Sequence, residues 1–457
     1  MNLTRREFSL IAGAAVKLLR AEDPRMVKAR RKPNDEWHEY ATRTLDRVTG
    51  FQPLREAQKT DSYGGRLDRK KRATGFFYPT KLSGRWYLID PAGNPYIQAG
   101  ICSLAAGKSA TNLTNLKAIF GTPENWAAEA SDLLRSNGFT ACGGWSDVDL
   151  LRTAPHRLVY CTTGNFMGDF GRSQHLTHQQ AGHLGYANDL IPVFHPDFEA
   201  ACDAAAKKLA ATKDDPFLLG HFSDNELPAP PDLLDRALHL APDDPGRRAA
   251  EKWLAARKSG ALANPANEDR EAFRGYVYDR YFQLTTTAIR RYDPNHLCLG
   301  PRMHGPFLRS APVMQAAGRY LDALSLNVYN YWAPPAELMA MWSGQSGKPF
   351  LVTEWYTKGE DSGYPNTSGA GWNVPTQQDR GWFYQNFTLV LLESKNCIGW
   401  HWFKYLDNDP DDLTTDPSNR DSNKGIVNLR YEPYANLVAA MKSLNANIYT
   451  LADYFDR

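Results

Sequence analysis

Lys348-Pro-Phe-Leu-Val-Thr-Glu-Trp-Tyr356 is the stretch that decides the fold assignment of this chain. Its apolar run, 350–352, is of the kind that a strand buried on both faces requires. A proline precedes the run, and a segment rich in Gly, Ser, Asn and Pro follows at 359–375. Glu354 therefore stands where a buried parallel strand ends, and the carboxyl ends of such strands form the active-site face of an α/β barrel.

A second carboxylate lies upstream in similar surroundings. Phe217-Leu-Leu-Gly-His-Phe-Ser-Asp-Asn-Glu226 is again a short apolar run that ends in polar residues, and prolines follow it. Glycoside hydrolysis generally needs two carboxyl groups, one to protonate the leaving oxygen and one to attack or to activate water. Glu226 and Glu354 are 128 residues apart (354 − 226), which is enough for about three β/α units of roughly 40 residues each. This spacing would put them on strands four and seven of eight.

The rest of the chain alternates apolar runs with helical segments, which favours an α/β fold over a sandwich. We predict a (β/α)8 TIM barrel with long insertions in its βα loops and an N-terminal extension. Apart from the two runs that carry the glutamates, strands are expected at 95–101, 139–144, 158–162, 296–300, 323–328 and 397–403. Helices are expected at 123–137, 195–212, 247–257, 272–292, 375–394 and 432–444.

The residues around both glutamates resemble known motifs. Asp224-Asn225-Glu226 and Thr353-Glu354-Trp355 resemble the acid/base and nucleophile motifs of clan A retaining glycoside hydrolases. The closer likeness, over roughly 75–445, is to the β-agarase-like branch, and it rests on the segments 84–95, 222–228, 400–408 and 422–426. The resemblance implies a retaining β-glycoside hydrolase for galactose-containing or related polysaccharide. It also implies that Glu226 is the acid/base and Glu354 the nucleophile.

Other polar and aromatic residues at strand ends are candidates for substrate binding. By the resemblance, Asn225 bonds the sugar 2-hydroxyl, and Tyr329 could bond the nucleophile from strand six. Arg302 and His304 follow strand five, where they would hold the nucleophile's charge or a sugar hydroxyl, or else form a structural ion pair. The remaining candidates are Asn327 as a hydrogen-bonding group, Trp145 and Asp147 as cleft or packing residues, and Trp400 as a sugar platform.

The assignment of Trp400 depends on strand parity. Trp400 and Trp402 alternate with His401, so only one of these two sets can face the barrel lumen. Because a tryptophan of strand eight commonly forms a sugar platform in clan A, Trp400 is the preferred platform.

Composition excludes several functional classes. The chain has 53 basic and 51 acidic residues, a net charge of +2, so it lacks the basic excess expected of a nucleic-acid-binding protein. It has no run of about 20 apolar residues, so no membrane span is expected. Aromatic residues make up 12% of the chain, which suits a carbohydrate substrate but also a packed core. The sequence leaves the oligomeric state open.

No metal or cofactor is expected. The six cysteines form no CxxC pair, and His175, His178 and His183 lack an accompanying metal-binding signature. The acidic segment 407–412 has alternating aspartates, as a calcium loop does. It lacks the glycine and the glutamate of that loop, so a solvated loop over the cleft is favoured, with calcium as the alternative.

The N-terminus resembles a twin-arginine export signal, with Arg5-Arg6 ahead of a short apolar segment. We therefore expect 1–21 to be a signal, 22–74 an extension that wraps the barrel, and 75–457 the catalytic domain. A periplasmic or extracellular location follows from this assignment.

Two other functions remain open at this stage. An exo-β-galactosidase or another β-glycosidase of the same clan would differ only in the insertions around the cleft. A carbohydrate-binding pseudoenzyme on the same barrel is disfavoured because both glutamates are present.

Overall fold

The computed structural model of the protein describes residues 24–54, 58–180, 182–257, 265–412, 414 and 419–457. The predicted export signal, 1–21, lies outside these residues. Among the described residues, no helix combines the length and the apolar character needed to cross a membrane.

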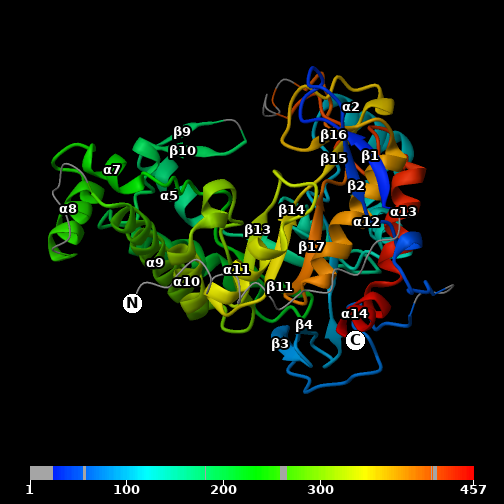
Figure 1. Ribbon diagram of the computed structural model, residues 1–457, viewed down its shortest axis with the longest axis horizontal. Coiled ribbons are helices and arrows are strands. Elements are labelled where there is room, and N and C mark those ends of the chain that lie inside the picture. Colours follow the sequence, from blue (N-terminus) through cyan, green and yellow to red (C-terminus); the bar gives the residue numbers. More distant parts are fainter. Residues whose placement is uncertain (1–23, 55–57, 181, 258–264, 413, 415–418) are drawn as a thin grey trace, which may run out of the picture.

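Eight parallel strands form the centre of the molecule (Figure 1). In chain order they are β6 (Gln98–Cys102), β7 (Ala141–Cys142), β8 (Val159–Thr163), β11 (Leu218–Phe222), β12 (Leu297–Gly300), β13 (Leu324–Asn327), β14 (Phe350–Glu354) and β17 (Cys397–Phe403). Each strand pairs with the next from β6 to β12 and from β13 to β17, and β17 pairs with β6. Between β12 and β13 the Met303 N–H donates to the Ser325 carbonyl, and the Asn327 N–H donates to the Met303 carbonyl, both at 2.8 Å. These bonds close the ring, so the predicted (β/α)8 barrel is confirmed.

Helices cover the outside of the barrel. The main ones are α3 (Pro123–Ser136), α6 (Phe198–Ala206), α9 (Asn267–Tyr292), α10 (Ala311–Tyr320), α11 (Ala336–Ser346), α12 (Gln377–Glu393) and α13 (Ala435–Asn445). α12 begins with a capping box between Thr376 and Asp379, which satisfies backbone N–H groups that have no partner inside the helix. The predicted helix 195–212 is shorter, because 207–212 is a 3-10 helix. A final helix, α14 (Ile448–Asp456), was not predicted.

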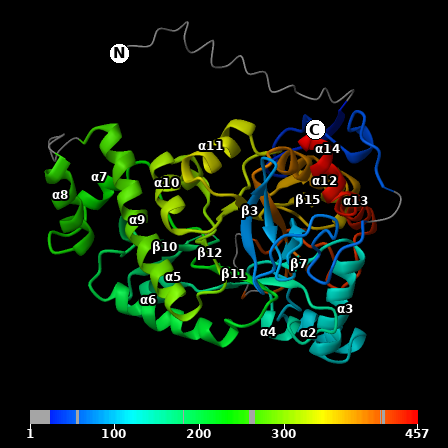
Figure 2. The ribbon, with the colours of Figure 1, turned by 90° about the horizontal axis from the view of Figure 1, so that it is seen from below.

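An antiparallel sheet closes the amino-terminal end of the barrel. Its strands are β3 (Tyr78–Leu82), β4 (Arg85–Ile89) and β5 (Pro95–Tyr96). Figure 2 shows β3 across this end of the molecule. Leu88 and Tyr96 pack with apolar residues from inside the barrel, including Leu219 and Leu299. This antiparallel sheet therefore seals the barrel opposite the face that carries the glutamates.

The loops at the carboxyl ends of the strands contain secondary structure that the sequence did not predict. The polar segment after β8 forms α5 (Phe166–Ser173) and a hairpin of β9 (Thr177–Gln179) with β10 (Leu184–Tyr186). The insertion after β11 holds two helices, α7 (Leu233–Leu238) and α8 (Pro245–Arg257), where one was predicted. After β14, β15 (Thr357–Gly359) pairs with β16 (Trp372–Val374). The β9–β10 hairpin and the β15–β16 pair stand on opposite sides of the barrel mouth (Figure 1).

The first loops carry two further helices. α2 (Ala110–Ile119) follows β6, and α4 (Val148–Leu151) follows β7.

The described part of the N-terminal extension lies along the barrel. It begins with a hairpin of β1 (Arg25–Ala29) and β2 (His38–Thr42). Arg30 and Asn373 of β16 exchange backbone hydrogen bonds. Tyr40 stacks on Trp332, with the two ring centres 5.2 Å apart. Further on, Arg66 pairs with Asp453 of α14 at 2.7 Å. The extension thus reaches from the barrel mouth to the opposite end.

Candidate active site

Glu354 ends β14 and is held by three side chains. Its Oε1 atom forms an ion pair with the Arg302 guanidinium at 2.6 Å and accepts from the Trp145 indole N–H at 3.2 Å. Its Oε2 atom accepts from the Tyr329 hydroxyl. The side chain is only 6% exposed, and charge-assisted hydrogen bonds of this kind stabilise an ionised carboxylate. The arrangement therefore suits a carboxylate that must stay charged.

Arg302 lies directly beneath this carboxylate. It follows β12 in a left-handed backbone conformation, with φ of 50°, and it is fully buried. Gly144 allows the close approach, because a Cβ at that position would lie 3.0 Å from the guanidinium carbon. Burial acts to lower the pKa of Arg302, but the charge of Glu354 together with Cys102, Tyr329 and Glu226 outweighs burial, so the pKa is raised overall. The ion pair is therefore an integral part of the barrel lumen.

Glu226 lies four residues beyond β11 and faces Asn327. Its Oε1 atom accepts from the Asn327 amide N–H at 2.8 Å, and the Asn327 oxygen in turn accepts from Thr353 at 2.7 Å. Although part of the residue is exposed to the cavity, loss of surrounding water and the nearby Glu354 charge raise the pKa of Glu226 to about 7. The raised pKa lets Glu226 hold a proton up to about neutral pH, whereas Glu354 faces an arginine, an indole and a phenol.

The turn that carries Glu226 is fixed by its neighbours. Asp224 is buried and accepts from the N–H groups of Met167 and Gly168, both at 2.9 Å, and from the Tyr281 hydroxyl at 2.6 Å. The Glu226 N–H donates to the Pro301 carbonyl at 3.0 Å. These bonds hold Glu226 in its left-handed conformation, with φ of 50°, so its carboxyl group has a defined position.

Asn225 is oriented by the same network. Its side-chain oxygen accepts from Arg302 at 3.1 Å and from Asn327 at 3.3 Å. Among the described residues, none accepts a hydrogen bond from its amide nitrogen. Because Asn225 lines the cavity, this nitrogen can donate to a bound molecule.

Both glutamates open into one cavity of about 350 Å³. Its walls come from strand ends and from loops on both sides: Lys32, Trp145, Gly182, His183, Asn225, Glu226, His304, Tyr329, Glu354, Tyr356, Gly369, Ala370, Phe403 and Asn419. The Trp145 side chain is 43% exposed, so its ring is free to stack on a sugar. Burial lowers the pKa of His304, which leaves a neutral imidazole at the wall.

The cavity continues on both sides of the glutamates. One neighbouring cavity, of about 290 Å³, shares Trp145, His183 and Asn225 with it. Another, of about 560 Å³, shares His304 and Tyr329. The three cavities therefore adjoin one another at these shared residues.

Most of the predicted site residues converge, but two do not. Trp400 is fully buried, and its indole N–H donates to the Tyr384 hydroxyl of α12 at 2.9 Å. His401, not Trp400, faces the lumen, where it bonds Gln98 at 2.8 Å. Trp400 therefore cannot act as a sugar platform. Asp147 also lies outside the cavity lining, and its carboxylate accepts from the Ala106 N–H at 3.3 Å.

Arg302 and Asn327 contact the glutamates and do not line the cavity around them, although Asn327 lines the neighbouring cavity of about 560 Å³. Both residues therefore position the carboxyl groups, and Asn327 also faces the adjoining space.

Sequence reasoning missed several lining residues. Lys32 comes from the N-terminal extension, and His183 comes from the turn of the β9–β10 hairpin. Phe403 ends β17, and Tyr356 follows Glu354 by two residues. The position of Tyr356 was a usable signal, whereas nothing local in the sequence marks Lys32 or His183.

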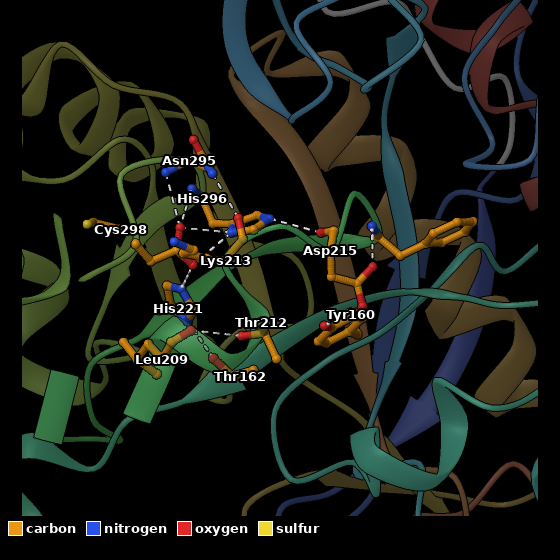
Figure 3. Close-up of polar contacts among 12 residues, drawn as sticks. Tyr160, Thr162, Leu209, Thr212, Lys213, Asp215, His221, Asn295, His296 and Cys298 are labelled. Carbon is orange, nitrogen blue, oxygen red and sulfur yellow. Dashed lines mark hydrogen bonds and ion pairs between the residues drawn. The ribbon is translucent and has the colours of Figure 1, made fainter. Parts of the chain in front are cut away.

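One group of described residues has the composition of a metal site: His221, Asp293 and His296 (Figure 3). His221 Nε2 and His296 Nδ1 each lie 2.8 Å from Asp293 Oδ2. The other ring nitrogens bond Thr162 at 2.6 Å and the Asp215 carbonyl at 3.0 Å. Since every ring nitrogen has a partner, these hydrogen bonds explain the closeness of the side chains without an ion. None of the three lines the cavity.

The acidic segment after β17 is the predicted solvated loop only in part, because Pro410 and Asp411 are exposed whereas its first residues are buried. Asp407 is buried, and its oxygens accept from the Gly425 N–H at 2.7 Å, from the Tyr434 hydroxyl at 2.6 Å and from Asn423 at 3.0 and 3.1 Å. Asp409 is also buried. Through these bonds Asp407 anchors the loop that contains Asn423 and Gly425. Its carboxylate oxygens are thus already occupied by protein donors.

The chain is similar to solved structures over most of its length. To the crystal structure of BpGH50 it is 31% identical, with 95% of this chain and 96% of the other covered and a TM-score of 0.85. An exo-beta-agarase structure is 22% identical, with 88% of this chain and 68% of the other covered and a TM-score of 0.72. The structure of PfGH50B is 20% identical, with 88% of this chain and 70% of the other covered and a TM-score of 0.73. The similarity to the exo-beta-agarase and to PfGH50B concerns the fold alone.

Curated sequences give a consistent result. Beta-agarase B of Vibrio sp. (strain JT0107) is 23% identical, with 85% of this chain and 50% of the relative covered. Beta-agarase A of the same strain is also 23% identical, with 87% of this chain and 48% of the relative covered. The chain thus spans about half the length of these relatives. No protein-family profile matches it.

Proposed function

The chain belongs to the agarase-like glycoside hydrolases, and on this premise we propose that it hydrolyses β-glycosidic bonds in galactose-containing polysaccharide of the agar type, with retention of configuration. The observation that carries the proposal is the contrast between the two carboxyl groups. Glu354 is held by an arginine, an indole and a phenol, whereas the pKa of Glu226 is raised to about 7. Two carboxyl groups in one site with opposed surroundings are typical of an acid and a nucleophile.

The first step would form a covalent intermediate. Glu226 gives its proton to the glycosidic oxygen as the bond to the anomeric carbon breaks, and Glu354 attacks that carbon from the opposite face. The Arg302 guanidinium and the Tyr329 hydroxyl hold the Glu354 carboxylate in position for this attack. The leaving sugar departs with the proton, which leaves a glycosyl ester on Glu354.

The second step would reverse the roles. The Glu226 carboxylate takes a proton from water, and the resulting hydroxide displaces Glu354 from the anomeric carbon. Because the configuration is inverted twice, the product keeps the β configuration. The amide N–H of Asn225 is placed to donate to a sugar hydroxyl, which is an interaction that can strengthen in the transition state.

Retention can be tested by proton NMR during hydrolysis of neutral agarose oligosaccharides and aryl β-galactosides. We expect the first-formed reducing end to be the β anomer, before mutarotation mixes the two forms. An initial α product would instead mean direct attack by water, and would contradict the proposed role of Glu354. The lengths of the products also separate an agarase from an exo-β-galactosidase, which releases only single galactose units.

The pH dependence of kcat/KM should reveal the acid. Glu226 must be protonated to act, so hydrolysis of neutral oligosaccharides is expected to fall about tenfold per pH unit above its pKa of about 7. A dinitrophenyl β-galactoside has a leaving group that needs no proton, so its kcat/KM should lose much less over the same pH range. If kcat/KM falls with the same midpoint and slope for both substrates, the loss of activity at high pH reflects the titration of a group other than Glu226.

A further inference from the structure

The N-terminal extension brings a cation to the cavity. Lys32 lines the cavity together with both glutamates. Its ammonium group donates to the carbonyls of Thr367 and Gly369 at 3.3 and 3.5 Å. Within the described part of the chain these are the only acceptors of its ammonium hydrogens, and both bonds are long. Lys32 therefore keeps most of its capacity to bind an anion.

Two further lysines lie near the wall of the cavity that Lys32 lines. Lys358 is buried and donates to the carbonyls of Asn366 and Ser368 at 3.0 and 2.8 Å, so it contacts the same 366–369 turn, but burial lowers its pKa to about 7 and it adds only part of a charge at neutral pH. Lys424 lies 5.4 Å from the Tyr356 ring centre and 5.2 Å from that of Phe403. Both of these rings line the cavity.

Asp421 offsets part of this charge. It accepts from the N–H groups of Thr367 and Ser368, both at 2.9 Å, and so fixes the turn. The Asp421 carboxylate does not line the cavity.

The carboxyl groups that line the cavity do not neutralise this side. They are Glu226 and Glu354. The Glu354 carboxylate is paired with Arg302 at 2.6 Å, and the pKa of Glu226, raised to about 7, reduces the negative charge that this group carries at neutral pH. A neutral sugar has no charge to set against the ammonium group of Lys32, whereas an anionic substituent would form a charge-assisted hydrogen bond with it.

We infer that Lys32 binds an anionic substituent, a sulfate ester or a carboxylate, on the galactan unit held in this cavity. The inference rests on the proposed function and narrows its substrate class to acidic galactans. Both substituents present oxygen acceptors with negative charge, which is the chemistry that an ammonium group recognises. Lys32 is then a specificity-determining residue, because it discriminates between charged and neutral forms of the same sugar.

The test compares matched galactan oligosaccharides of one length that are neutral, sulfated or carboxylated. We expect wild-type kcat/KM to be about 10- to 100-fold higher for at least one of the two charged forms, the size expected of one charge-assisted hydrogen bond. Lys32→Met should remove this preference, while kcat/KM for the neutral substrate should stay within about threefold of the wild-type value. Lys32→Arg should retain the preference. Lys28→Met, at an exposed position of the same extension, is the matched control. It should change neither the preference for the charged form nor kcat/KM for the neutral substrate.

Two results would overturn the inference. One is a wild-type enzyme without preference for either charged form. The other is an equal loss on charged and neutral substrates in Lys32→Met, which would make Lys32 a ligand of an ordinary hydroxyl. The charged form that loses its advantage in Lys32→Met identifies the substituent.

Binding separates failure of this inference from failure of the proposed function. Calorimetric titration of Glu354→Gln measures oligosaccharide affinity without turnover. Tighter binding of a charged form that requires Lys32, in a protein whose wild type cleaves none of the three substrates, would support the inference and reject the hydrolase. Cleavage of the neutral form without charge preference would support the hydrolase and reject the inference.

Discussion

Glu354→Ala is expected to lower kcat on agarose oligosaccharides by on the order of 10⁵-fold, equivalent to about 7 kcal/mol of activation free energy. The substitution removes the proposed nucleophile together with the acceptor of Arg302, Trp145 and Tyr329. Added azide should restore cleavage of a dinitrophenyl β-galactoside and give an α-galactosyl azide, because the small anion takes the place of the missing carboxylate. Kinetics and NMR of the azide product are the measurements.

Loss of folding must be separated from loss of the nucleophile. Removing one partner of a buried ion pair costs about 3–5 kcal/mol of stability, so Glu354→Ala should also melt at a lower temperature. Glu354→Gln keeps an oxygen that can accept from Arg302 and is the matched control. It should lose activity as severely while its melting temperature falls less. An active Glu354→Gln enzyme would exclude Glu354 as the nucleophile.

Glu226→Ala is expected to lower kcat/KM on agarose oligosaccharides by roughly 10²–10⁴-fold, the usual contribution of general acid catalysis. The loss should depend on the leaving group. With a dinitrophenyl β-galactoside, kcat/KM should stay within about tenfold of wild type, since departure of dinitrophenolate needs no proton. Azide should now yield a β-galactosyl azide, because the anion attacks the intermediate on Glu354 from the face that Glu226 occupied.

The control for this variant is Glu226→Gln, which can still accept the Asn327 amide hydrogen but cannot supply an acidic proton. It should share the leaving-group dependence of Glu226→Ala. If both glutamate variants returned azide products of the same configuration, the assignment of acid/base and nucleophile would be wrong.

The local sequence was sufficient to find the barrel and its two glutamates. A buried parallel strand needs a continuous apolar run, and its carboxyl end must change to polar residues where it meets the active-site face. Both requirements can be read in a window of ten residues, as they were for β11 and β14. The order of the runs then placed Glu226 and Glu354 on strands four and seven, which the structure bears out.

Other residues that the sequence singled out next to strand ends lie close to the two glutamates. Asn225, His304 and Tyr329 lie in the cavity lining, and Arg302 and Asn327 contact the glutamates. Their proximity follows from the closed barrel, because every strand end meets at one mouth. Sequence could not tell which of them face substrate and which only hold a carboxyl group.

Two features were decided by the tertiary structure alone: which side chains of a strand face the barrel lumen, and which residues remote in sequence reach the cavity. In β17 the register against β6 turns His401 inward and leaves Trp400 against α12, and a one-residue change of register would exchange the two faces. Lys32 reaches the cavity because the backbone of the extension bonds to Asn373 of β16, hundreds of residues along the chain. His183 reaches it through the turn of a hairpin within a polar segment. Such contacts depend on packing between segments that are remote in sequence, so no local pattern of apolar and polar residues encodes them.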